Sequence, residues 1–207
     1  MERDTITAVL PVAYWGDTEY FARLVRGGEG CVIDIHEHYI KRSLRNRTEI
    51  MTANGTMPLS VCLQHADRPR TPVCDVRIDY SKRWQHQHWT AICSAYRSSP
   101  YFDMIADRIA RFYEREWRYL VDYDLEILHE IFSLLSLEPK FSLSDAYVEP
   151  RTDALDLRPK KRETPFDAPR YFQLFSDRMP FAPNLSMLDL LMCEGPAATC
   201  VLDNCRL

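Results

Sequence analysis

Glycine is scarce in this chain. Only 6 of its 207 residues are glycine, roughly half of the ~7% that is usual in soluble proteins. None of the six forms part of a G-x-G-x-x-G or G-x-x-x-x-G-K-S/T pattern, which excludes the standard dinucleotide fingerprint and the P-loop. No serine lies in a G-x-S-x-G context either, so a hydrolase nucleophile elbow is not indicated.

Long apolar runs and closely paired cysteines are missing as well. No window holds the roughly 18 consecutive apolar residues of a membrane helix. The N-terminal stretch carries acidic residues and Pro11, whereas a signal peptide needs a basic start and an unbroken apolar core. The seven cysteines include no C-x-x-C, which argues against a structural zinc knuckle. We therefore expect a cytoplasmic protein with reduced, buried cysteines and no membrane insertion.

The charge balance gives no excess of positive charge. The chain has 26 Lys and Arg against 30 Asp and Glu, for a net charge of -4, so we expect no nucleic-acid partner. The length favours one domain over two, and a chain this long can bury an apolar core without disulfides or metals.

The first half of the sequence has the pattern of strands with one helix. Strands are predicted at residues 6–14, 31–35, 49–52, 59–63 and 76–80. A helix over residues 19–26 joins the first two strands into a β-α-β unit, which requires them to run parallel. Asn54-Gly55 predicts a hairpin between the third and fourth strands.

The second half of the sequence has the spacing of helices. One helix is predicted over residues 84–97, a second begins near Pro100, and a third is capped by Asp124. We predict a single α/β domain over residues 1–207. Its mixed or mostly parallel sheet comes from the N-terminal half and is covered by helices from the C-terminal half.

The last part of the chain begins with a stretch that is dense in proline and charge. Residues 149–169 predict a long surface loop, either a mobile lid or ordinary disorder, in which the run Arg158 to Arg162 is solvated. A short strand over residues 171–175 and a helix over residues 186–193 are predicted to close the fold.

Four of the six histidines fall into two H-x-H triplets, His36-Glu37-His38 and His86-Gln87-His88. On an extended backbone such a pair can chelate one metal ion, and neutral imidazole also suits acid–base chemistry. In a helix, two residues of separation place the second pair on different sides. One imidazole of that pair would then be hydrogen-bonded inside the protein, and the other would face water.

Four cations directly follow the first triplet, in the segment Lys41-Arg42-Ser43-Leu44-Arg45-Asn46-Arg47. The planar fork of arginine suits phosphate and carboxylate groups, so this cluster predicts a phosphate-bearing small molecule. The alternative is a set of surface cations paired with acids. Further along, Asp75, Arg77 and Asp79 share one face of a predicted strand, most simply as a solvent-facing ion ladder. A cysteine–histidine pair is a weaker candidate for nucleophilic chemistry.

Four sequence blocks together resemble a known family. They are LPVAYWGDTEYFARL at residues 10–24, IHEHYIKRSLRNRTEI at 35–50, DVRIDYSKRWQHQHWTAICSAYRSSPYF at 75–102 and DRMPFAPNLSMLDLLMCEGP at 177–196. In this order they resemble the WbqC-like family of bacterial proteins, which is associated with O-antigen and other surface-polysaccharide genes. His38 departs from the family pattern, which has Asn there, and this weakens the first triplet as a metal motif.

The resemblance implies a cytoplasmic protein of surface-polysaccharide biosynthesis that transfers an acyl or aminoacyl group onto an amino sugar or sugar nucleotide. The expected ligand is an anionic small molecule, either a sugar nucleotide or a carrier-bound acyl group, with a carrier protein as a further partner. The resemblance does not identify a cofactor. The alternatives are a non-catalytic scaffold protein of a glycan-assembly pathway and a metal-dependent hydrolase.

We expect the site residues to meet in one cleft at the carboxyl ends of the strands, without a metal. The catalytic candidates are His36, Glu37, His86 and His88, of which His36 or His88 is the base. The substrate-binding candidates are Lys41, Arg45, Asn46, Arg47, Tyr96, Asp177, Arg178 and Asn184.

Overall fold

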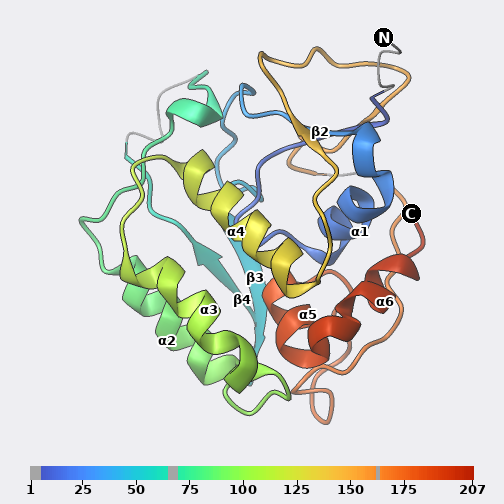
Figure 1. The fold of residues 1–207 in the computed structure, drawn as a ribbon. Helices are drawn as coiled ribbons and strands as arrows, with labels where there is room; N and C mark the ends of the chain where they lie inside the picture. Colours follow the sequence, from blue (N-terminus) through green and yellow to red (C-terminus); the bar gives the residue numbers. More distant parts are fainter. Residues whose placement is uncertain (1–5, 65–69, 162–163) are drawn as a thin grey trace.

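The computed structural model describes residues 6–64, 70–161 and 164–207. Its four-stranded sheet has the order β5-β2-β1-β6, with all neighbouring strands parallel, and a separate two-stranded hairpin joins β3 to β4 (Figure 1). The strands are β1 Ala8–Leu10, β2 Cys31–Ile33, β3 Arg47–Thr52, β4 Gly55–Ser60, β5 Ser142–Leu143 and β6 Leu155–Asp156. The α-helices are α1 Thr18–Gly27, α2 Trp84–Tyr96, α3 Phe102–Glu114, α4 Leu120–Leu134, α5 Met187–Glu194 and α6 Ala198–Asp203.

The predicted β-α-β unit is confirmed as β1, α1 and β2. Leu10 pairs with Ile33 in parallel register. The first strand is much shorter than predicted, because Pro11 has no N–H to donate to a neighbouring strand. Asp17 caps α1 by accepting a hydrogen bond from the Tyr20 N–H at 2.9 Å.

The predicted hairpin is also confirmed. Thr52 pairs with Gly55 at the tip, where Gly55 has φ of 104°, a left-handed conformation that favours glycine. The second hairpin strand ends at Ser60, three residues before the predicted end.

Two predicted strands are absent from the described part of the chain. Residues 76–80 alternate between buried and exposed as a strand would, but they form only isolated bridges, at Arg77 with Tyr119 and at Ile78 with Leu63. Residues 171–175 run into a turn, in which the Gln173 carbonyl accepts from the Ser176 N–H. The Gln173 side chain is buried and bonded to Ala182, so this segment packs through its side chains rather than by strand pairing.

The two edge strands of the parallel sheet come from the second half of the chain. β5 pairs with β2, and β6 pairs with β1. Each has only two residues, which is too short for a periodic pattern in the sequence. β6 lies inside the predicted surface loop 149–169, so part of that loop belongs to the sheet.

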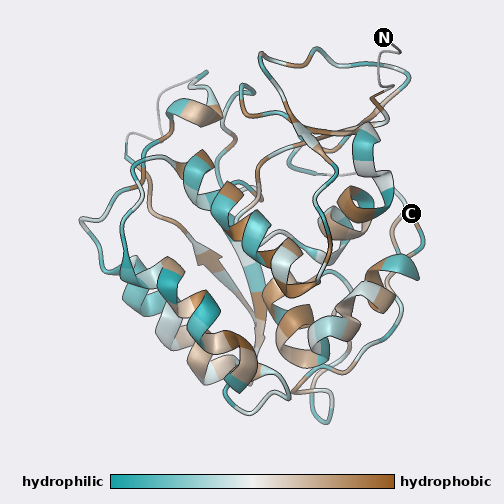
Figure 2. Ribbon diagram, viewed as in Figure 1, coloured by the Kyte–Doolittle hydropathy of each residue, from teal (hydrophilic) through white to brown (hydrophobic). Residues whose placement is uncertain are grey.

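Helices from the C-terminal half pack on this frame, and together they form a mixed α/β domain. α2 and α3 lie side by side, and α5 lies beside α6 (Figure 1). α5 is apolar along nearly its whole length in Figure 2, in agreement with its burial from Met187 to Cys193. In the described residues, no helix is both long and apolar enough to cross a membrane.

The start of the third long helix corrects a prediction. α4 begins at Leu120, so Asp124 lies inside the helix instead of capping it. Asp124 is buried, and neither of its carboxyl oxygens has a hydrogen-bond partner among the residues that the structure describes.

Candidate functional site

Polar side chains meet where the parallel strands end. Asp34 directly follows β2 and Ser144 directly follows β5. The Ser144 hydroxyl donates to Asp34 Oδ1 at 3.0 Å, and Arg158, just after β6, donates to Asp34 Oδ2 at 2.6 Å. Asp34 is fully buried. This group was missed in the sequence, where Arg158 was predicted to be solvated; instead it is a buried partner of Asp34.

Glu37 and Arg45 form a second buried ion pair at the same edge. The Arg45 guanidinium donates to both carboxylate oxygens of Glu37 and also to the Ser43 hydroxyl and the Arg158 carbonyl. Burial raises the pKa of Glu37 to about 7, and the charge of Arg45 opposes that rise. These contacts hold the buried Arg45 guanidinium and both carboxylate oxygens of Glu37. Arg45 is therefore not available for the phosphate binding expected of it, and Glu37 is not available for the catalytic role expected of it.

The first histidine triplet does not act as one unit. His36 is half-buried, and its Nδ1 lies 3.8 Å from the Sγ of Cys74. Burial, followed by the charge of Asp75, raises the pKa of the Cys74 thiol, which disfavours the nucleophilic thiolate. His38 is exposed and stacks on Tyr147.

The second triplet is split by the helix, as its spacing predicts. His88 is buried, and its Nδ1 is hydrogen-bonded to the Tyr14 hydroxyl at 2.8 Å, whereas His86 is exposed. Burial lowers the pKa of His88 to about 4, so this imidazole is neutral at pH 7. Rings of Trp84 and Tyr113 surround it. The expectation that His88 and His36 face one cleft is therefore wrong, because α2 turns His88 into the aromatic core.

Several expected substrate-binding residues are also held elsewhere. Tyr96 is buried and donates to Asp189 Oδ1 at 2.8 Å. Asn46 is buried and donates to the Val61 carbonyl. Asp177 and Arg178 are exposed and pair with each other at 3.2 Å. Lys41 is exposed and does not line the pocket described next.

Two of the expected residues, Arg47 and Asn184, do line one hollow, of about 280 Å³. We call it the carboxyl-edge pocket. Its lining residues are Asp17, Arg42, Ser43, Leu44, Arg47, Thr48, Glu49, Lys160 and Asn184. Three of them, Arg47, Thr48 and Glu49, belong to β3. The others come from the segments that follow β1, β2 and β6 in the chain and from the segment before α5. β2 and β6 flank β1 on opposite sides, so the chain reverses its direction across the sheet at this point. Ligands of open α/β sheets bind at such reversals.

The carboxyl-edge pocket has positive charge to offer a ligand. Arg42 and Lys160 form no ion pair or hydrogen bond through their side chains with any residue that the structure describes. Arg47 pairs with Glu49 at 3.3 Å, in a half-exposed contact. Arg42 has φ of 53°, a conformation that is uncommon outside glycine and that often marks functional sites.

The acidic and neutral polar groups of the pocket differ in their hydrogen bonding. The carboxylate of Asp17 caps α1, and the Asn184 Oδ1 accepts from the Glu19 N–H at 2.9 Å. This leaves the Asn184 amide nitrogen as a donor. The Thr48 hydroxyl is buried and has no hydrogen-bond partner within the described residues. The pocket therefore combines two unpaired cations with further donors, which suits an anion.

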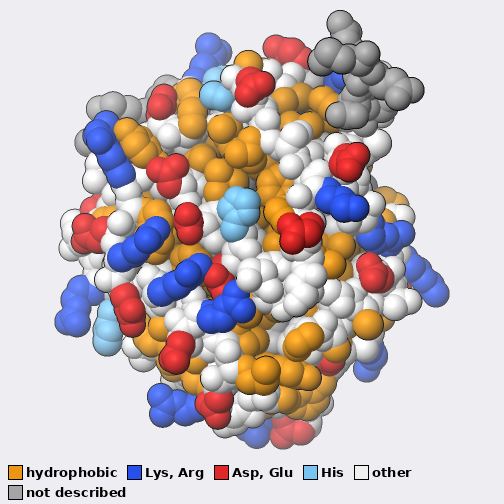
Figure 3. Space-filling view, viewed as in Figure 1, with side chains coloured by type: hydrophobic (Ala, Val, Ile, Leu, Met, Phe, Trp, Pro, Cys, Tyr) orange, Lys and Arg blue, Asp and Glu red, His pale blue; other side chains and the backbone are white. Residues whose placement is uncertain are grey.

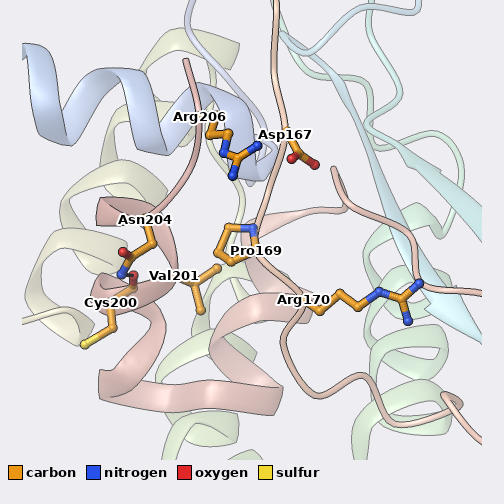
Figure 4. Close-up of a pocket in the computed structure, with 7 residues that line it drawn as sticks. All are labelled: Asp167, Pro169, Arg170, Cys200, Val201, Asn204 and Arg206. Carbon is orange, nitrogen blue, oxygen red and sulfur yellow. Dashed lines mark hydrogen bonds between the residues drawn. The ribbon is translucent and has the colours of Figure 1, made fainter.

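A larger hollow of about 450 Å³ lies beside α6 and contains none of the expected residues (Figure 4). Its Arg170 points away from the other lining side chains in that view and stacks over Phe181. Among the described residues, no group of three or more His, Cys, Asp or Glu side chains is placed to hold a metal ion.

The fold and the pocket define an α/β protein with a hollow lined by Arg42, Arg47 and Lys160 at the carboxyl edge of its sheet. The chain belongs to the WbqC-like protein family, whose family model matches residues 14–161. It is also similar to the uncharacterized protein Rv1507c of Mycobacterium tuberculosis (strain ATCC 25618 / H37Rv). The two are 28% identical over 202 residues, which cover 81% of this chain and 85% of the relative. No solved structure matches the chain.

Proposed function

We propose that this protein binds the phosphate group of a sugar nucleotide or of a carrier-bound acyl group in the carboxyl-edge pocket. It would act in bacterial surface-polysaccharide biosynthesis, of the O-antigen type, as a cytoplasmic acyl- or aminoacyl-transferase on an amino sugar. Support for the pathway comes from membership of the WbqC-like family. Support for the ligand comes from the pocket itself.

The observation that carries the proposal is the pair of unpaired cations, Arg42 and Lys160, on one small hollow. Cations that face each other across a pocket repel unless an anion lies between them. Arg42 precedes the hairpin and Lys160 follows β6, so the fold brings them together from distant parts of the sequence. Arginine can grip a phosphate with two parallel hydrogen bonds, while lysine contributes a point charge.

The size of the pocket limits what it can hold. A volume of about 280 Å³ lies at the lower end of the usual range for small-molecule sites. We therefore expect the pocket to hold the phosphate end and an adjoining sugar or pantetheine unit, with the rest of the ligand over the rim.

Transfer onto an amine also needs a group that takes the proton of the acceptor. Glu49 is exposed, lines the pocket and has one weak partner, Arg47, so it is the base that we propose in place of the histidines. The amine nitrogen would form the new bond to the acyl carbon while the bond between that carbon and the thioester sulfur of the carrier breaks. Glu49 would take the proton from the amine and pass it to the departing thiolate, which leaves as the thiol.

A non-catalytic binding role is the second candidate. It is favoured by one observation: the described lining residues of the carboxyl-edge pocket include no imidazole and no thiol. In that case ligands would bind without being converted, and the Glu49→Gln variant would retain full function.

Calorimetric titration with inorganic phosphate, UDP-N-acetylglucosamine and coenzyme A tests the binding. We expect saturable binding of at least one of them, weakened about tenfold or more in Arg42→Ala and in Lys160→Ala, since a charge-assisted hydrogen bond is worth about 1.5–3 kcal/mol. Lys140→Ala is the matched control, because Lys140 is an exposed lysine outside the pocket. Equal affinity in all four proteins would remove the pocket from consideration. Product analysis with acyl carriers and aminosugar nucleotides then separates the transferase from the binding protein.

A further inference from the structure

Two hollows away from the carboxyl-edge pocket share the residues Tyr80 and Glu116. One, of about 450 Å³, extends toward Gln64 and Trp117. The other, of about 390 Å³, extends toward Trp89 and contains His86. Because they share these two lining residues, the hollows lie next to each other, and we call the two together the aromatic groove. It has no residue in common with the carboxyl-edge pocket.

We propose that the aromatic groove binds a polyhydroxylated chain, an oligosaccharide, along its length. Aromatic side chains present apolar surface to the C–H faces of sugar rings, and amide or carboxylate groups beside them bond the hydroxyls. The groove offers both kinds of group, from two helices and the segment between residues 76 and 80.

The aromatic side chains are already fixed in place. The Tyr80 hydroxyl accepts from the Trp117 N–H at 2.8 Å and donates to the Trp117 carbonyl at 3.2 Å. Trp89 stacks on Tyr113 with ring centroids 5.9 Å apart. Rigid aromatic rings lose little conformational entropy when a ligand binds.

Several polar groups of the groove lack partners. The indole N–H of Trp117 has no acceptor within the described residues, but it is buried, and the Arg115 guanidinium lies over the Trp117 ring at 4.1 Å, so this N–H is not itself offered to a ligand. Glu114 and Glu116 line the same hollow as Lys82 and Arg83, yet none of these four forms an ion pair with a described residue. They remain available for hydroxyl groups.

The sign of the rim charges argues for an uncharged or zwitterionic chain over a polyanion. A nucleic-acid strand needs a track of cations, but carboxylates interrupt the cations of this rim. On the face drawn in Figure 3, too, acidic and basic side chains are interspersed and form no patch of one sign.

Calorimetry with chitotetraose, maltotetraose and oligouridylate as probes tests the proposal. We expect millimolar or tighter binding of an oligosaccharide, weakened about tenfold in Trp89→Leu, the size of effect that removal of an aromatic anchor has. Glu116→Gln is a second variant, because Glu116 is exposed and its replacement leaves the core intact. We expect it to weaken binding severalfold. Phe172→Leu is the control, an exposed aromatic residue outside the groove.

Three results would overturn the proposal: no oligosaccharide binding by the folded wild-type protein, unchanged affinity in both groove variants, or binding of oligouridylate alone. Lys160→Ala keeps the two sites apart. If that variant, and not the groove variants, lost the oligosaccharide, the ligand would lie in the carboxyl-edge pocket and the groove proposal would fail. The phosphate-binding proposal would survive every one of these outcomes.

Discussion

At the scale of single residues, Asp124 is a carboxyl group buried in the core whose desolvation is not offset by hydrogen bonds from the described residues. It lies inside α4, and neither carboxyl oxygen has a hydrogen-bond partner among the described residues. Burial raises its pKa well above the ordinary value, so the side chain keeps its proton. A buried polar group without a partner costs about 1–3 kcal/mol.

Replacement of this carboxyl by an apolar side chain should therefore stabilise the protein. We expect Asp124→Leu to raise the free energy of unfolding at pH 7 by about 1–2 kcal/mol, since the desolvation cost disappears while the side chain keeps the same number and branching of heavy atoms. Urea denaturation measures the effect. Asp122→Leu is the control, because Asp122 is exposed on the same helix and should change stability by about 0.5 kcal/mol or less. A less stable Asp124→Leu protein would mean that Asp124 has a partner that the structure does not show.

At the scale of elements, Arg158 holds the second half of the sheet together. It donates to Asp34 after β2, to Asp156 of β6 and to the Val148 carbonyl, and it stacks over Tyr147. β6 has only two residues, so its backbone hydrogen bonds alone give little stability. The arginine therefore ties β6 and the segment after β5 to the end of β2.

Loss of this arginine should loosen β6 selectively. Arg158→Met leaves the Asp34 carboxylate buried without its counter-ion, which costs about 3–5 kcal/mol. Hydrogen exchange should become faster at the amides of Leu155 and Leu157, which bond to Thr7 and Val9.

The control for this variant lies in the same part of the chain. Within the described part of the chain Arg151 pairs with Asp153 alone, and both are exposed, so Arg151→Met should change neither stability nor exchange measurably. Unchanged exchange at Leu155 in Arg158→Met would show that β6 is held by its backbone pairing.

At the scale of the whole molecule, the sequence predicts those helices and strands that are long enough to show a periodic pattern of apolar residues. β1, β2, the hairpin and four helices carry such patterns, and they lie close to their predicted positions. β5 and β6 do not, because a two-residue strand is set by tertiary pairing alone. Their positions, however, determine where the sheet reverses and hence where the carboxyl-edge pocket forms.

The candidate site, like the fold, could be predicted only in part from the sequence. The cation cluster at residues 41–47 and Asn184 indicated the correct segments, and Arg47 and Asn184 line the pocket. The sequence could not distinguish Arg42, which is unpaired, from Arg45, which is locked to Glu37. In a loop without helical or strand periodicity, only tertiary packing decides which arginine is buried. For the same reason Lys160, in a run that looked uniformly solvated, was not recognised as part of a site.

Two of the buried titratable groups, His88 and Asp124, should make contributions to stability that have opposite slopes with pH. The folded pKa of His88, about 4, lies below its unfolded value of about 6.5. Its contribution is therefore complete above pH 6.5 and is lost as the pH falls to about 4, by up to roughly 3 kcal/mol. The pKa of Asp124 is raised on folding, so its contribution is complete below pH about 4 and is lost as the pH rises. We subtract the unfolding free energy of each variant from that of the wild type. For His88→Gln we expect this difference to grow from pH 4 to pH 6.5. For Asp124→Asn we expect it to shrink over the same interval. Guanidinium titrations at half-unit steps of pH measure both. Parallel curves for wild type and His88→Gln would mean that folding leaves the pKa of His88 unchanged, and the description of its aromatic surroundings as a core that disfavours the charged imidazole would then be wrong.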